Sequence, residues 1–170
     1  MKANYLLNVL SEDKKGLVSS ITNLLNRKGI EMESICTGKT DIHNQVLINI
    51  QLTAEKQEIK MMALKIKNII EVCQVKAFLL QDSWYQKVAL YVLEKEGYNA
   101  DVYNKIQKYG AVLVGFLNDD LIIQKTGRDE DILALYNALD GKHLKKFSKS
   151  AAISFNNLDM DEEAVISLAA

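Results

Sequence analysis

The sequence predicts an α+β protein made of two βαββαβ units in tandem. In both halves, short apolar or alternating segments typical of strands occur in the same order with two amphipathic segments that have helical spacing. The halves share this order but little sequence, so we interpret them as a structural duplication. Each unit is expected to place two helices on one face of a four-stranded antiparallel sheet. The opposite face then needs cover from another sheet or subunit, which predicts a homo-oligomer, at least a dimer.

The first unit begins with the apolar segment 4–12, which is bounded by charged residues and predicts a strand. The helix that follows has apolar side chains at helical spacing, namely Leu17, Val18, Ile21, Leu24 and Leu25. Gly29 ends this helix, as glycine commonly does. Residues 30–38 alternate in polarity and residues 44–53 are apolar on one face, which predicts two strands joined by a hairpin turn.

A second helix and a fourth strand complete this unit. The helix is expected from the apolar side chains of Ile59, Met62, Ala63, Ile66 and Ile70. Segment 72–80 then predicts the strand that closes the βαββαβ order.

The second unit starts with a predicted strand at 87–94. Asn99 is the expected N-cap of its first helix, and Gly110 is the expected end. Residues 111–117 and 121–127 predict two strands, with a turn between them at Asn118, Asp119 and Asp120. The apolar side chains expected on the last helix, which Gly141 ends, are Ile132, Leu133, Tyr136 and Leu139.

The alternating segment 147–155 predicts the final strand. We therefore expect a first domain at residues 1–81, a second at 82–157, and a flexible acidic tail at 158–170.

The composition is that of a globular protein, with 48% hydrophobic and 25% charged residues. Twenty-one basic and 22 acidic residues leave a net charge of −1, which gives no electrostatic footprint for nucleic acid or an anionic membrane. No signal peptide or membrane-spanning run is predicted, so the expected compartment is the cytoplasm. Cys36 and Cys73 are too few for a disulfide framework.

The sequence gives little support to the interpretation that this protein is an enzyme. His43 and His143 stand beside turns, outside any catalytic motif, and are interpreted as surface residues. Cys36 and His43 could share a metal across the hairpin, but a third ligand is not evident and packing is the simpler interpretation. Basic clusters at Lys14–Lys15 and at residues 143–149 are interpreted as solvated surface, with a partner surface as the alternative. Neither a phosphate-binding loop nor a nucleophile elbow occurs.

The stretch Asp13-Lys14-Lys15-Gly16 separates the first strand from the first helix. The backbone N–H groups at a helix start are unpaired and lie at the positive end of the helix dipole, so such a loop suits a carboxylate ligand. Gly16 would let a ligand approach the backbone closely. The alternative is a plain helix start that Asp13 caps. From the residues alone, both interpretations stand.

Residues 5–34, YLLNVLSEDKKGLVSSITNLLNRKGIEMES, resemble the first ACT domain of the regulatory small subunit of acetohydroxyacid (acetolactate) synthase. The positions that match that family's segments are Gly16-Leu17, Arg27-Lys28-Gly29 and Met32-Glu33-Ser34. The segments 87–94, 126–139 and 148–155 look like the family's C-terminal domain. The resemblance covers about residues 4 to 156, and the second domain makes it more specific than an ACT domain alone.

This resemblance implies two ferredoxin-like domains, an N-terminal ACT domain for dimerisation and effector binding and an ACT-like C-terminal domain, in a subunit without chemistry or a cofactor of its own. Such subunits bind a catalytic large subunit that uses thiamine diphosphate, Mg and FAD. They raise its activity and confer feedback inhibition by valine or another branched-chain amino acid. The alternative is a stand-alone amino-acid-sensing ACT protein without a synthase partner.

The resemblance also implies an effector site between two protomers. The residues that map to it are Asp13, Lys14, Lys15, Gly16 and Leu17 of one protomer and Ile30, Glu31 and Met32 of another. The family usually has Asn at the positions of Asp13 and Glu31. An amide both donates and accepts hydrogen bonds, whereas an ionised carboxylate only accepts them and repels the carboxylate of an amino acid. The sequence therefore predicts altered or weakened valine sensitivity.

Overall fold

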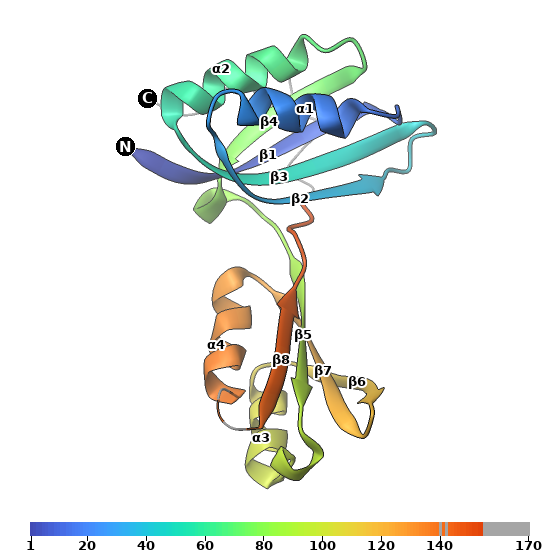
Figure 1. Ribbon diagram of the computed structural model, residues 1–170, viewed down its shortest axis with the longest axis vertical. Helices are drawn as coiled ribbons and strands as arrows, with labels where there is room; N and C mark the ends of the chain where they lie inside the picture. The colour runs from blue at the N-terminus through green and yellow to red at the C-terminus, as the bar shows by residue number, and fades with distance from the viewer. Residues whose placement is uncertain (140, 142, 155–170) are drawn as a thin grey trace. The chain divides into compact units, whose positions relative to one another are not determined.

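The structure, a computed structural model, describes residues 1–139, 141 and 143–154. The expected tail at 158–170 lies outside these residues. The described chain forms two compact units, one of Met1–Trp84 together with the segment that begins at Ala152, and one of Tyr85–Ala151. Each unit is an antiparallel four-stranded sheet with two helices, which confirms the predicted α+β class (Figure 1). No helix in the described ranges is both long and apolar enough to cross a membrane.

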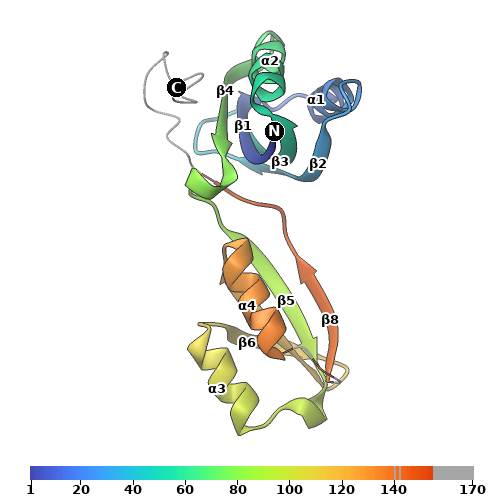
Figure 2. The ribbon, with the colours of Figure 1, turned by 90° about the vertical axis from the view of Figure 1, so that its left-hand side faces the viewer.

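The first unit has the strand order β2-β3-β1-β4. Its strands are β1 (Lys2–Glu12), β2 (Glu31–Lys39), β3 (Gln45–Glu55) and β4 (Val72–Leu79), and its helices are α1 (Leu17–Asn26) and α2 (Lys56–Lys67). Both helices lie on the same face of the sheet (Figures 1 and 2). The core between them is apolar and includes Leu7, Val9, Ile21, Ile48, Ile50 and Ile66. A short 3-10 turn, η1 (Leu80–Asp82), follows β4.

Helix α2 begins and ends earlier than its apolar residues suggest. Glu55 is its N-cap and forms a capping box with Glu58, whose side chain accepts a hydrogen bond from the Glu55 amide at 2.9 Å. The helix ends at Lys67, so the prediction that Ile70 lies on its apolar face is wrong, and Ile70 is 97% exposed. In the first helix, Val18 lies on α1 as expected but is 37% exposed.

The face of the first sheet opposite its helices carries buried polar side chains, and part of its cover comes from the same chain. Asn8 and Asn49 lie opposite each other on β1 and β3, and both are buried. The Asn8 amide donates to the Ser154 hydroxyl at 2.7 Å, and that hydroxyl donates to the Asn49 carbonyl oxygen at 3.2 Å. The prediction that only another sheet or subunit could cover this face is therefore wrong, because the chain returns to it after the second unit.

The second unit has the order β6-β7-β5-β8. Its strands are β5 (Lys87–Leu93), β6 (Val112–Leu117), β7 (Asp120–Gly127) and β8 (Leu144–Lys149), and its helices are α3 (Ala100–Lys108) and α4 (Asp129–Leu139). A 3-10 turn, η2 (Lys95–Gly97), precedes α3. The core includes Ala89, Tyr91, Leu93, Ile123, Ile132 and Leu135.

The helix cap and the hairpin turn that the sequence predicts in the second unit are both present. Asn99 caps α3, because its side-chain oxygen accepts a hydrogen bond from the Val102 amide at 3.0 Å. Asn118 and Asp119 have φ of 49° and 70°, the conformation of a tight hairpin turn between twisted strands. Both predictions are confirmed.

Leu133 lies on α4, as expected, and is 56% exposed, whereas Ile132, Leu135 and Leu139 are the buried residues of this helix. One prediction in this unit is wrong. The last strand runs from Leu144 to Lys149 rather than over 147–155, and the chain leaves the sheet after Lys149.

Candidate functional site

The loop between β1 and α1 ends at Gly16, which is the N-cap of α1. Gly16 has φ of 87°, in the left-handed region, and no side chain caps the helix. The prediction that Asp13 caps α1 is therefore wrong. The Asp13 amide instead donates to the Asn44 carbonyl at 2.9 Å, which ties the loop to the turn between β2 and β3. The side chain of Asp13 is left exposed.

The start of α1 presents unpaired backbone donors. The Leu17 amide donates to the Lys14 carbonyl at 3.3 Å, but the amides of Gly16, Val18 and Ser19 have no acceptor within the described ranges. A side chain built at Gly16 would meet no atom within 4 Å, so the approach to these amides is open. The loop can therefore receive a carboxylate at its backbone, which is one of the two interpretations that the sequence leaves open.

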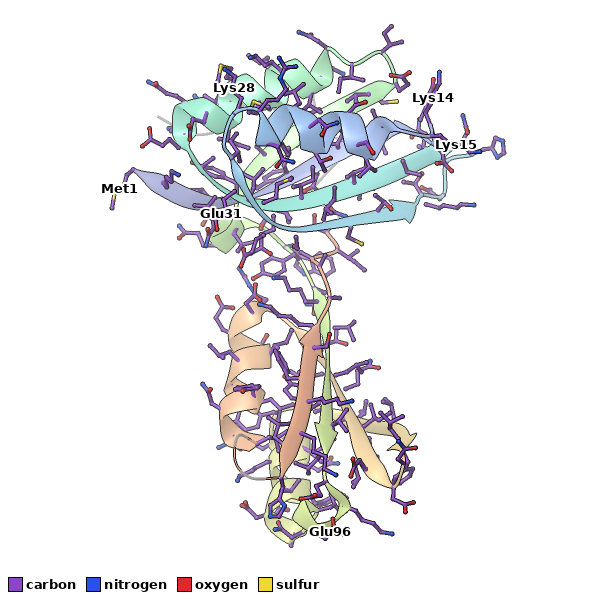
Figure 3. The ribbon with its side chains drawn as sticks, viewed as in Figure 1. Met1, Lys14, Lys15, Lys28, Glu31 and Glu96 are labelled. Atoms are coloured by element: carbon purple, nitrogen blue, oxygen red, sulfur yellow. The ribbon has the colours of Figure 1, made fainter. Side chains whose placement is uncertain are left out.

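The two lysines of the loop differ in their partners. Lys14 Nζ lies 3.4 Å from Glu71 Oε1, whereas Lys15 is exposed and has no ion pair with any residue of the described chain. Both lie at the same end of the first unit (Figure 3). Lys15 thus supplies a solvated positive charge beside the open amides of α1.

Asp13 lines a different surface from Gly16. It borders an open cavity of about 390 Å³ whose other lining residues come from the hairpin at Lys39–Gln45. Gly16 does not line this cavity. The polar groups of the loop therefore face two places, the hairpin side through Asp13 and the helix start through Gly16.

The second group of predicted site residues lies at the start of β2. Ile30 is 5% exposed, Met32 is half-buried against the core, and Glu31 is exposed and pairs with Thr53 of β3. Leu17, at the other end of α1, is also buried. Ile30 and Leu17 can therefore offer a ligand their backbone but little of their side chains.

One chain does not bring the two groups together. Lys15 and Glu31 lie at opposite ends of the first unit (Figure 3), and the ten residues of α1 separate them, about 15 Å of helix. An amino acid cannot bridge that distance. A site that uses both groups needs the loop of one protomer and the β2 start of another.

The second unit contains two side-chain clusters that the sequence analysis does not predict. The Asp129 carboxylate, at the start of α4, lies 2.7 Å from both Lys87 Nζ and Lys149 Nζ and accepts a hydrogen bond from the Tyr85 hydroxyl at 3.2 Å. Burial alone would raise the pKa of this carboxyl, but hydrogen bonds from Lys149 and Lys87, and their charges, lower the pKa. The separation of these residues along the chain gives no sequence signal for the cluster.

The second cluster corrects the interpretation of His143. Its Nδ1 lies 3.1 Å from Glu94 Oε2 in a half-buried pair, so it is not a simple surface residue. Hydrogen bonds from His143 and Lys145 lower the pKa of the Glu94 carboxyl. Neither cluster offers a nucleophile beside a base. Among the described residues, no three His, Cys, Asp or Glu side chains gather as a possible metal site, and Cys36 and His43 do not belong to one.

No protein-family model matches the chain. The curated acetolactate synthase small subunit of Mycobacterium bovis is 22% identical over 89% of this chain and 91% of its own length. The small subunit of Mycobacterium leprae is 23% identical over 89% of this chain and 90% of its own. A crystal structure of the acetolactate synthase small subunit of Thermotoga maritima superposes with a TM-score of 0.80 at 18% identity, and covers 92% of this chain and 99% of that one. Over nearly its whole length, the chain is therefore similar to acetolactate synthase small subunits, with a fold of two ACT-like, ferredoxin-like domains.

Proposed function

We propose that this protein is a non-catalytic regulatory subunit of acetolactate synthase. In this proposal it binds the thiamine-diphosphate-dependent catalytic subunit, raises its activity, and mediates feedback by a branched-chain amino acid. The chain carries no cofactor of its own, and the catalytic partner uses thiamine diphosphate, Mg and FAD. It works in the cytoplasm with that partner, as a homodimer or larger assembly, without nucleic acid or membrane.

A single observation carries the proposal. The likeness to small subunits runs through both domains, since it covers 89% of the chain in sequence and 92% in fold. An ACT domain alone occurs in many regulators, so a likeness restricted to the first domain would support only a general amino-acid sensor. A likeness that spans both domains supports the more specific assignment.

The proposed effector site combines the loop Asp13–Leu17 of one protomer with Ile30–Met32 of another. The open amides at the start of α1 would bind the effector's carboxylate, with Lys15 adding charge. Asp13 and Glu31 would attract its ammonium group, but they would also repel its carboxylate and could donate no hydrogen bond to it, so the net effect is weaker binding. Coupling between such a site and the catalytic subunit typically amounts to about 1 to 3 kcal/mol, and it is reciprocal. The effector must therefore bind one state of the complex better than the other.

The direct test is reconstitution with the catalytic subunit encoded in the same genome. We expect the two chains to co-elute on size exclusion and the synthase activity to rise several-fold when this chain is added. The matched control adds an unrelated ACT-domain protein at the same concentration. Failure to co-elute, with unchanged activity, would reject the regulatory-subunit proposal.

Calorimetric titration of the isolated chain with valine, leucine and isoleucine tests the effector site separately. Binding of an amino acid without any association with the synthase would favour the stand-alone sensor instead. Binding seen only in the reconstituted complex would place the effector site at an assembled interface.

A further inference from the structure

Strand β6 forms one edge of the sheet in the second unit (Figure 1). It pairs with β7, and no other strand of the described chain lies on its opposite side. The backbone N–H and C=O groups on that side therefore have no strand partner. An edge of this kind is a template on which a further strand can pair.

The side chains of β6 are apolar and exposed on both faces of the sheet. Phe116 and Leu117 are 67% and 45% exposed, although successive residues of a strand point to opposite faces. Val112 and Leu113, in the other half of the strand, are 54% and 43% exposed. The helices of the second unit therefore cover neither face of β6. Large contiguous apolar patches on a protein surface usually mark interaction sites.

The other edge strands of the two sheets carry charges, which normally prevent edge-to-edge pairing. The charged residues in β2 include Glu31 and Glu33, β4 contains Lys76, and those in β8 include Lys145 and Lys146. Strand β6, with the sequence VLVGFL, contains no charged residue. Among the edges that the structure describes, β6 is therefore the one without this protection.

The chemistry of β6 indicates what covers it. A strand that completes this edge extends both apolar faces of β6, so it must itself be apolar on both faces. Among the described strands, β6 combines this property with an open edge. The strand that fits β6 is therefore β6 of a second copy.

The charges that flank β6 set the direction of the pairing. Lys108 precedes the strand and Asp119 follows it, and both are exposed and form no ion pair within the described chain. An antiparallel pair brings the Asp119 end of one copy beside the Lys108 end of the other, and twofold symmetry makes this contact twice. A parallel pair would bring like charges together. We propose that two copies of this chain associate by antiparallel pairing of β6 with β6, which joins the sheets of their second domains.

This proposal goes beyond the regulatory function, because the contact would form whether or not the chain regulates a synthase. It also uses none of the residues of the proposed effector site, all of which belong to the first domain. Failure of either proposal therefore leaves the other intact.

Sedimentation equilibrium with variants at Val114, in the middle of β6 and 50% exposed, tests the contact. Val114→Lys and Val114→Glu each place like charges near each other across the twofold axis and remove apolar contact, so each should weaken self-association about tenfold. An equimolar mixture of the two variants should recover association, because opposite charges then face each other.

The matched controls are Leu133→Lys and Leu133→Glu, at a position on α4 that is 56% exposed. Both should associate like the wild type. If the Val114 variants also associate like the wild type, or if their mixture does not recover association, the two copies do not meet at β6. A wild-type chain that stays monomeric at every concentration would likewise overturn the proposal.

Hydrogen exchange on the wild-type chain keeps the test decisive if a variant does not fold. The backbone amides of β6 should exchange more slowly when the protein concentration is raised about a hundredfold, since association pairs the open edge. The charged edge strand β8 is the internal control, and its exchange should not depend on concentration. Exchange in β6 that is unaffected by concentration would overturn the proposal, because a second copy is then not the cover.

Discussion

At the scale of single residues, the start of α1 depends on the backbone of Gly16. Its φ of 87° costs a residue with a side chain about 1 to 2 kcal/mol, although a side chain would meet no neighbouring atom. A substitution at Gly16 would therefore introduce backbone strain without a steric clash. Gly16 also leaves the amides of Val18 and Ser19 open, because no side chain caps them.

Gly16→Ala is expected to lower the free energy of unfolding by about 1 to 2 kcal/mol, as measured by urea titration. The matched control is Gly38→Ala in β2, where the added carbon also meets no neighbour and φ is not positive. That change should be neutral or slightly stabilising, because glycine weakens a strand. A similar loss in both variants would contradict the assignment of strain to Gly16.

Asp13 and Glu31 are the residues expected to weaken effector binding. Replacing both by asparagine restores groups that can donate to an effector carboxylate and removes two like charges. Since an unpaired buried ligand oxygen costs about 1 to 3 kcal/mol, Asp13→Asn with Glu31→Asn should tighten valine binding about 5- to 150-fold. Calorimetric titration checks this, with Asp41→Asn on the neighbouring hairpin as the control. Unchanged affinity would show that neither carboxylate faces the effector.

At the scale of elements, Asp129 joins three parts of the second unit. It begins α4, contacts Lys87 on β5 and contacts Lys149 on β8. The side chain of Lys87 is 2% exposed, so its charge depends on this carboxylate for compensation. The first turn of α4 is also acidic, which the helix dipole favours.

Asp129→Asn should destabilise the second unit by about 3 kcal/mol at neutral pH, because it leaves the charge of Lys87 buried without a counter-charge. The folded-state pKa of Asp129 lies below its unfolded value, so its stabilisation is full above about pH 4 and is lost as the pH falls through the folded pKa. The variant should therefore lose part of the acid dependence seen in urea unfolding between about pH 5 and pH 2. Asp101→Asn, which removes an exposed helix pair with Lys105, should cost about 0.5 kcal/mol or less.

Among the secondary-structure elements, some features could be predicted from the sequence and others could not. Asn99 and the Asn118–Asp119 turn were predictable because side-chain capping and positive φ act within a few residues. The end of the last strand was not predictable, because it depends on where Ser154 binds after the chain leaves β8. For the proposed effector site, the loop geometry followed from Gly16, whereas the separation of Lys15 from Glu31 needed the structure.

At the scale of the whole molecule, the two units have separate hydrophobic cores. Chains with two cores commonly depart from two-state unfolding. Calorimetry should therefore show two thermal transitions. Ile50 and Ile123 are both fully buried, one in each core, and form a matched pair of probes.

Ile50→Val and Ile123→Val should each cost about 1 kcal/mol, because each removes one buried methylene group. Each change should lower only its own transition, by about 4 to 8 °C. The two variants control for each other. A single transition that both changes shift equally would show that the chain unfolds as one cooperative unit.

The hydrogen bonds of Ser154 also impose an order on synthesis. The first domain needs a residue that the ribosome adds only after the whole second domain, so Asn8 and Asn49 emerge long before their partner. At about 5 to 20 residues per second, the nascent first domain waits several seconds with its polar sheet face incomplete. During that interval a chaperone or a neighbouring nascent chain can reach a surface that the finished protein closes.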